Sequence, residues 1–101
     1  EWEVHAPLAA KAGLGAATIS AIAENHTPES MNRDEALVYA LVTELHRGHV
    51  VNDATYEAAV AEFGEQGVVD LVALIGYYTT LAMVLNVAQT PPPFPGPAVS
   101  P

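Results

Sequence analysis

The sequence predicts an all-α fold. Apolar residues recur at the three- and four-residue spacing of helices, and residues that cap helices separate these segments. No alternating strand pattern is longer than the short connector at 49–51. The chain has 101 residues, of which 50% are hydrophobic and 15% charged, so we expect one folded domain rather than a disordered acidic chain. We assign this helical domain to residues 1–90.

Two helices are expected in the first part of the chain. The first covers residues 1–12 and ends at Gly13, a residue type that favours the left-handed conformation after a helix. The second covers residues 15–24 and places Ile19 and Ile22 on one face.

Pro7 leaves two interpretations of the first helix open. Proline has no backbone N–H, and its ring crowds the carbonyl group of Glu3, four residues earlier. Either a helix that starts upstream is kinked at Pro7, or Pro7 is the first helical residue and residues 1–6 are not helical. The residues alone favour the second interpretation.

The third helix has recognisable signals at both ends. Asn32 and Glu35 resemble a capping box, with Asn in the Ser/Thr role. We expect the helix to close with His46 and Arg47 in its last turn and with Gly48 beyond it.

Two more helices complete the expected domain. Asn52 or Asp53 caps the first of them, which ends at Gly64. The other runs from about residue 65 to residue 89 and stops before Pro91. Residues 91–101 hold six of the eight prolines, a composition that forms neither a helix nor a central strand, so we assign them to a tail.

The charged residues exclude several classes of function. With 3 basic and 12 acidic residues the formal net charge is −9, which argues against a nucleic-acid partner because phosphate binding needs clustered Lys and Arg. The chain has no cysteine, which excludes disulfides, thiolate metal sites and a cysteine nucleophile within these residues. We expect a cytoplasmic protein that has neither a metal nor a cofactor.

Residues 71–88 contain no charged side chain, and this segment is long enough to raise the possibility of a transmembrane helix. Gly76, Thr79, Thr80 and Asn86 dilute the apolar run, and no Lys or Arg flanks it. We therefore expect no membrane and predict instead that this helix packs against other subunits. Gly76 within it suggests a close approach between helices.

Glu1 and His5 are the candidate catalytic residues. They lie four residues apart, so on a helix they would share a face. A carboxylate beside an imidazole orients the ring and favours its protonated form, which suits proton transfer near neutral pH. Trp2 and Leu8 would supply an apolar wall. Because the chain starts within what reads as the middle of an element, we expect further residues upstream.

The sequence resembles the carboxymuconolactone decarboxylase family over roughly residues 1–90. The resemblance lies in Glu1-Trp2-x-x-His5-x-Pro7-Leu8-Ala9, in Ala12-Gly13-Leu14 with Ile19 and Ile22, and in Phe63-Gly64-Glu65-Gln66-Gly67-Val68-Val69-Asp70-Leu71-Val72 with Ile75-Gly76-Tyr77-Tyr78 and Leu85-Asn86. This family shares its all-helical fold with alkylhydroperoxidase D. The resemblance implies that N-terminal helices precede these residues and that the first helix continues through Pro7. It also implies a homo-oligomer, often a trimer or hexamer.

The resemblance also bears on the reaction. Peroxidases of this family carry a Cys-x-x-Cys-x-x-x-His motif, in which His5 matches the histidine and Glu1 stands where the second cysteine would be. The implied activity is therefore a cofactor-free lyase reaction on a small cyclic carboxylic acid or lactone, with His5 as general acid/base. The alternatives are an alkylhydroperoxidase-like antioxidant protein with a cysteine upstream and a non-catalytic oligomeric binding protein.

The remaining candidates have simpler interpretations. Trp2 and Tyr77 are candidate substrate-binding residues, although we expect burial with a satisfied hydroxyl group as the role of Tyr77 and Tyr78. His46 and His49 are three residues apart, but Gly48 lies between them and is expected to end the helix. We therefore predict that these histidines stabilise the helix end and bind no metal. An anionic substrate would need a cationic group, and Lys11, Arg33 and Arg47 are the candidates.

Overall fold

The computed structural model describes residues 2–89 and 91, and within them it contains helices and no strand. The all-α prediction is confirmed. The chain divides into two compact units, residues 1–31 with 85–101 and residues 32–84, and each unit is considered by itself. The tail predicted for residues 91–101 lies almost wholly outside the described residues.

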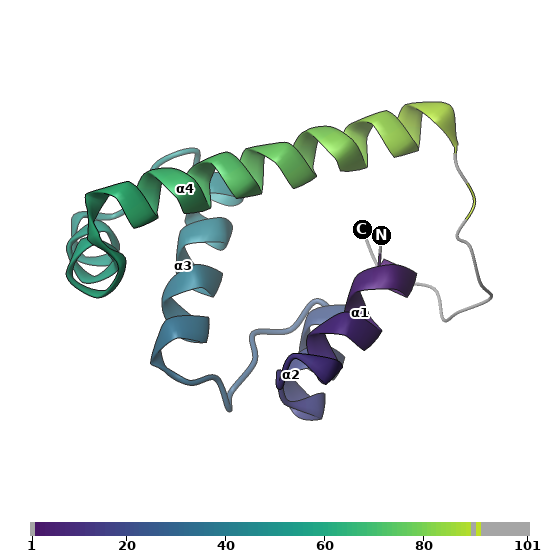
Figure 1. Ribbon diagram of the computed structural model, residues 1–101, viewed down its shortest axis with the longest axis horizontal. Coiled ribbons are helices and arrows are strands. Elements are labelled where there is room, and N and C mark those ends of the chain that lie inside the picture. The colour runs from purple at the N-terminus through teal and green to yellow at the C-terminus, as the bar shows by residue number, and fades with distance from the viewer. Residues whose placement is uncertain (1, 90, 92–101) are drawn as a thin grey trace. The chain divides into compact units, whose positions relative to one another are not determined.

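The first unit contains helices α1 (Trp2–Lys11) and α2 (Ala16–Ala23), which contact each other (Figure 1). Helix α1 includes Pro7 as an internal residue, so the interpretation of Pro7 as a first helical residue was wrong. An internal proline removes one backbone hydrogen bond and crowds the carbonyl group four residues earlier, so α1 continues through Pro7 at a local cost in stability. Helix continuation through Pro7 agrees with what the family resemblance implies.

Both helices of this unit end in the same way. Gly13 has φ 105° after α1, and Asn25 has φ 60° after α2. The next residue in each case donates its N–H to a carbonyl group five residues back, Leu14 to Ala9 at 3.0 Å and His26 to Ala21 at 2.8 Å. This is the Schellman pattern, in which the left-handed residue allows the last carbonyl groups to be satisfied. The predicted role of Gly13 is confirmed.

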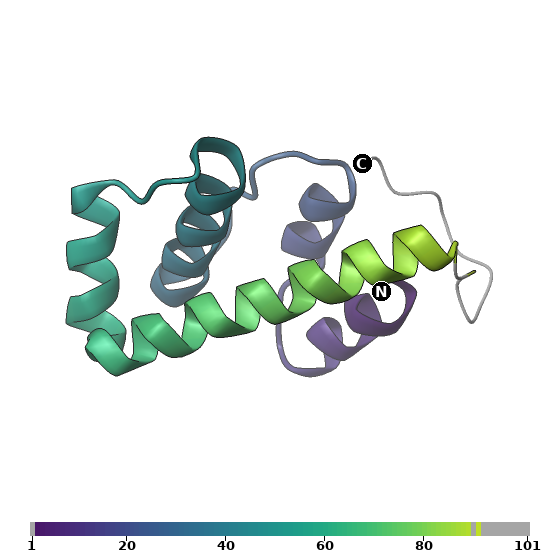
Figure 2. The ribbon, with the colours of Figure 1, turned by 90° about the horizontal axis from the view of Figure 1, so that it is seen from above.

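The second unit contains helix α3 (Arg33–Gly48) and most of helix α4 (Asp53–Ala88). Helix α4 is interrupted at Gly64, whose φ of 75° and ψ of 167° are not helical, and the chain turns sharply there (Figure 2). The predicted helix end at Gly64 is therefore confirmed as a break between residues 53–63 and 65–88. Leu41 of α3, Ala59 of the first part of α4 and Val68 of the second part are buried and form the core of the unit.

The end of α3 differs from the prediction. Gly48 is the last residue of the helix, and His49 takes the left-handed conformation with φ 57°. We expected glycine in that position because it has no Cβ to strain. Histidine is among the few other residues that are enriched there, so the helix extends by one residue.

Helix α4 is long and apolar enough to cross a membrane by length and composition alone. Only a small share of its most apolar stretch is buried within the described structure. Core helices of soluble proteins can have the same length and apolar composition. The residues that α4 exposes are therefore more informative about its surroundings than its composition.

Candidate functional site

The residues predicted for catalysis lie at the start of α1. His5 is exposed, Trp2 is half-buried and Leu8 is 55% exposed. Since residues three apart lie on the same side of a helix, Trp2 and Leu8 flank the imidazole of His5 on one face. Leu8 and His5 are open to solvent, and the apolar wall that Trp2 and Leu8 would supply stays a prediction. Glu1 lies outside the described residues.

The second predicted substrate-binding residue, Tyr77, belongs to α4 in the other compact unit. Its ring packs edge-on against that of Tyr78, with ring centroids 5.3 Å apart and an interplanar angle of 81°. The exposed fractions are 63% for Tyr77 and 39% for Tyr78, so the expected burial of the two rings was wrong. Neighbouring residues of a helix point about 100° apart: Tyr77 points away from the buried side of α4, whereas Tyr78, seven residues after half-buried Leu71, borders that side.

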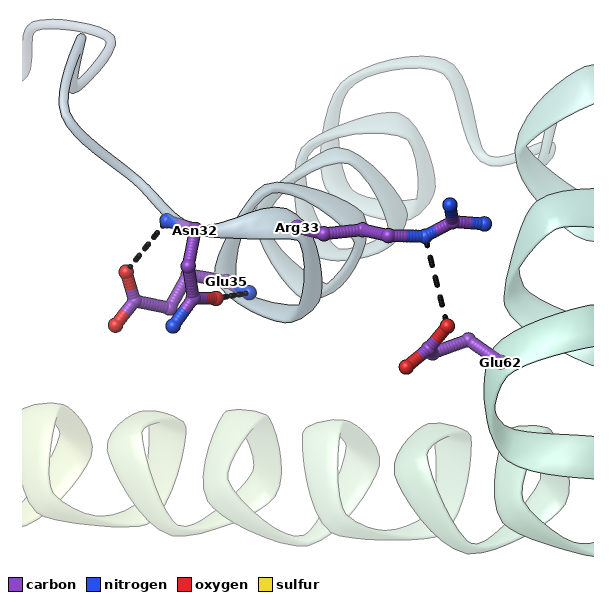
Figure 3. Close-up of polar contacts among 4 residues, drawn as sticks. All are labelled: Asn32, Arg33, Glu35 and Glu62. Carbon is purple, nitrogen blue, oxygen red and sulfur yellow. Dashed lines mark hydrogen bonds and ion pairs between the residues drawn. The ribbon is translucent and has the colours of Figure 1, made fainter.

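Of the three candidate cationic residues, Arg33 already forms an ion pair. Its Nε atom lies 3.5 Å from Oε2 of Glu62, in an ion pair between α3 and the first part of α4 (Figure 3). Lys11 lies in the last turn of α1 and Arg47 in the last turn of α3, where positive charge is favoured by the helix dipole. Lys11 is the only Lys or Arg within residues 2–31 and 85–89, the described part of the unit that holds His5.

The capping box predicted at the start of α3 is confirmed. Asn32 Oδ1 accepts the backbone N–H of Glu35 at 2.9 Å, and the Glu35 carboxylate accepts the backbone N–H of Asn32 at 3.0 Å (Figure 3). Each side chain accepts the backbone N–H group of the other residue, which has no partner within the helix, and the pair thereby fixes where α3 begins.

A polar contact that the sequence did not predict joins α3 to α4. His46 Nε2 lies 3.0 Å from Thr79 Oγ1, while His46 Nδ1 donates to the carbonyl oxygen of Val42 at 2.9 Å. The Thr79 hydroxyl also lies 2.7 Å from the carbonyl oxygen of Ile75. If the His46 ring is neutral, its Nε2 atom accepts a hydrogen bond from the Thr79 hydroxyl. If the ring is protonated, Nε2 donates to Thr79 Oγ1, and the Thr79 hydroxyl donates to the carbonyl oxygen of Ile75 instead. The contact is therefore possible in either protonation form of His46.

A second unpredicted contact fixes the start of α4. Glu44 Oε1 accepts the backbone N–H of Asn52 at 2.7 Å, and Glu44 Oε2 accepts the hydroxyl of Thr55 at 2.6 Å. One carboxylate of α3 thus holds the residue before α4 and a side chain of its first turn. The partners are 8 and 11 residues from Glu44, so no local sequence pattern could have indicated them.

Within residues 2–89 and 91, no group of three or more His, Cys, Asp or Glu side chains is arranged to hold a metal ion. Comparisons with protein families, with curated proteins and with solved structures give no match to this chain. Its function therefore has to be inferred from the residues themselves.

Proposed function

We propose that the chain is part of a carboxymuconolactone decarboxylase-like lyase that acts on a small cyclic carboxylic acid or lactone without a cofactor. The proposal depends on one observation above all: the exposed imidazole of His5 lies on a helix face between Trp2 and Leu8. An imidazole with apolar neighbours on the same face can exchange a proton with a small, partly apolar acid that docks there. The family resemblance of residues 1–90 supplies the reaction class.

His5 provides the proton that the reaction consumes. Cleavage of the bond to the carboxylate releases CO₂ and leaves its electron pair on the ring as a dienolate. Protonated His5 donates a proton to the carbon of this dienolate, and the imidazole then regains a proton from water. Glu1, four residues before His5, is proposed to orient the ring.

Binding of an anionic substrate requires a local positive charge, because the chain carries a net charge of −9. Lys11 is our candidate, since it lies on the same helix as His5, six residues or about 9 Å further along the axis. Trp2 would contact the apolar part of the substrate.

The proposal includes a homo-oligomeric protein of the cytoplasm, with no membrane or nucleic-acid partner. The lack of cysteine suits a reducing compartment, and the charge-free segment at 71–88 suits contact between subunits. The trimeric or hexameric state rests on the family resemblance.

The deciding experiment is an assay of γ-carboxymuconolactone decarboxylation, followed by the change in ultraviolet absorbance. We expect turnover by the wild-type protein and a loss of at least about 100-fold in His5→Ala, the usual size of a general acid/base contribution. His26→Ala is the matched control, because His26 is an exposed histidine in a loop. Equal turnover by His5→Ala and wild type would reject the role of His5. No turnover by the folded wild type would reject this substrate and favour the non-catalytic binding protein.

A further inference from the structure

The contact between His46 and Thr79 brings together three pairs of polar atoms. His46 Nδ1 lies 2.9 Å from the carbonyl oxygen of Val42, and His46 Nε2 lies 3.0 Å from Thr79 Oγ1. Thr79 Oγ1 lies 2.7 Å from the carbonyl oxygen of Ile75. All three distances are those of hydrogen bonds, and each hydrogen bond needs one proton between its two heavy atoms. The contact is therefore complete only when three protons are present.

The chemistry of the atoms decides which groups supply these protons. A carbonyl oxygen only accepts, so Nδ1 must donate to Val42 and the hydroxyl of Thr79 must donate to Ile75. A threonine hydroxyl has a single proton. Once this proton is directed at Ile75, Thr79 can only accept from His46, and Nε2 must donate as well. A ring with a proton on both nitrogens is the positively charged form of histidine.

A neutral ring can satisfy only two of the three pairs. If its proton is on Nδ1, the Thr79 hydroxyl can turn toward Nε2, but then Thr79 Oγ1 and the carbonyl oxygen of Ile75 face each other without a proton. If its proton is on Nε2, the same happens between Nδ1 and the carbonyl oxygen of Val42. Loss of one proton from His46 therefore removes one hydrogen bond and leaves two acceptor atoms opposed.

The charges near His46 on α3 act in both directions. Arg47 is the next residue and His49 follows the helix end, and both oppose a further positive charge. His46 lies in the last turn of α3, where the carbonyl groups of the helix end favour positive charge. Glu44 is the nearest acidic residue along α3, and it uses both carboxylate oxygens to hold the start of α4. These charges do not by themselves select one form of the ring.

The second part of α4 adds no charge beside the ring. Residues 71–84 carry no charged side chain, and Tyr77 and Tyr78 are the titratable groups next to Thr79. Among the residues that the structure describes, no Asp or Glu of either part of α4 forms an ion pair with His46. The number of hydrogen bonds is therefore the feature that distinguishes the protonated ring from the neutral ring.

We propose that the contact between His46 and Thr79 is a proton-sensitive clasp, which holds α4 against α3 more firmly when His46 is protonated. In the folded chain the protonated ring completes three hydrogen bonds and the neutral ring two, whereas in the unfolded chain water serves both forms. The folded chain thus binds this proton in preference to the unfolded chain. A fall in pH through the range in which histidine titrates therefore stabilises the second unit, and a rise in pH removes that stabilisation.

The clasp is independent of the proposed lyase reaction. It joins two helices of the second unit, whereas His5 belongs to the first unit. Its tests need no substrate, so a failure of the proposed reaction would leave it unaffected.

The first test measures the stability of the full chain by urea-induced unfolding at about pH 5.5 and about pH 8, on either side of the range in which histidine titrates. All titrating groups contribute to the ratio of the folding constants at these two pH values, so the ratio is compared between variants. Thr79→Val removes the hydroxyl and keeps the shape of the side chain. It should make the ratio of the folding constant at the lower pH to that at the higher pH about threefold smaller than in the wild type, because one partly exposed hydrogen bond is lost.

Two further variants control this comparison. Thr79→Ser keeps a hydroxyl and should restore the wild-type ratio to within about 1.5-fold. Thr80→Val removes the hydroxyl of the next residue, which is exposed and points about 100° away, and should leave the ratio equally unchanged. Equal ratios in Thr79→Val and Thr80→Val would overturn the proposal.

The second test uses the wild-type chain alone and does not depend on the folding of any variant. Nitrogen-15 NMR of the imidazole, assigned to His46 through its own Cβ, distinguishes ring nitrogens that carry a proton from those that do not. At about pH 5.5 both nitrogens of His46 should carry one. At about pH 8 Nδ1 alone should carry one, because the carbonyl oxygen of Val42 accepts only from a protonated Nδ1. A neutral ring with its proton on Nε2 would overturn the proposal, since the pair with Val42 would then not be a hydrogen bond.

Discussion

Replacement of Glu44 by alanine should destabilise the second unit more than any other single change of an acidic residue there. Glu44 accepts two hydrogen bonds, from the backbone N–H of Asn52 at 2.7 Å and from the hydroxyl of Thr55 at 2.6 Å. Hydrogen bonds to a charged group contribute about 1.5–3 kcal/mol each when they are shielded, and loss of a helix cap costs about 1 kcal/mol. Glu44 is only half-buried and its contact with Asn52 is exposed, so we take about 1 kcal/mol for each hydrogen bond and expect a loss of about 2 kcal/mol in the free energy of unfolding.

For a chain of this size, about 2 kcal/mol corresponds to a fall of roughly 8–16 °C in Tm. The measurement is urea-induced unfolding followed by far-ultraviolet circular dichroism, at one fixed protein concentration because self-association shifts apparent stability. Glu57→Ala is the matched control, since Glu57 is an exposed glutamate near the start of α4. A double-mutant cycle with Thr55→Val isolates the hydroxyl contact.

The reasoning fails if Glu44→Ala and Glu57→Ala lose the same stability to within about 0.5 kcal/mol. It also fails if the cycle shows no coupling between positions 44 and 55. In either case the two hydrogen bonds of Glu44 would contribute nothing to the net free energy of unfolding.

Three further substitutions test other parts of the fold. Asn32→Ala should lower the free energy of unfolding by about 1 kcal/mol and Asn32→Asp should restore most of it, since aspartate keeps the accepting oxygen; denaturant titration of both variants checks this. Gly64→Ala should lower the free energy of unfolding by about 1–2 kcal/mol, because φ 75° disfavours any residue with a Cβ. Gly76→Ala, which lies in regular helix, should raise the free energy of unfolding, and thermal unfolding of both variants checks these opposite effects. His46→Ala should cost about 0.5–1.5 kcal/mol relative to the His26→Ala control, and Thr79→Val should reproduce that loss in the same denaturant assay.

Local features of the fold were predictable from the sequence because they depend on neighbouring residues. The Asn32–Glu35 capping box spans three residues, and the left-handed turn at Gly13 depends on one. The break at Gly64 is of the same kind. In each case the backbone conformation follows from the chemistry of a single residue or a single turn.

Features that depend on distant residues were not predictable. The contact between His46 and Thr79 spans 33 positions, and nothing in either local sequence distinguishes those residues from others of their type. The expected burial of Tyr77 was wrong because aromatic side chains favour burial only where a neighbouring element covers them. For the candidate site, the structure shows that His5 is exposed, whereas its pairing with Glu1 and its contact with Trp2 stay predictions.

The break at Gly64 divides α4 into two helices that must each nucleate on their own. A left-handed residue interrupts the ladder of backbone hydrogen bonds, so helical order cannot propagate from one part to the other. The first part spans residues 53–63, which is shorter than the roughly 12–15 residues that an isolated helix needs in water. It should therefore form only when Ala59 is buried and Glu44 holds its start. The part after Gly64 is long enough to persist alone, and its amide hydrogens should exchange with solvent more slowly than those of residues 53–63.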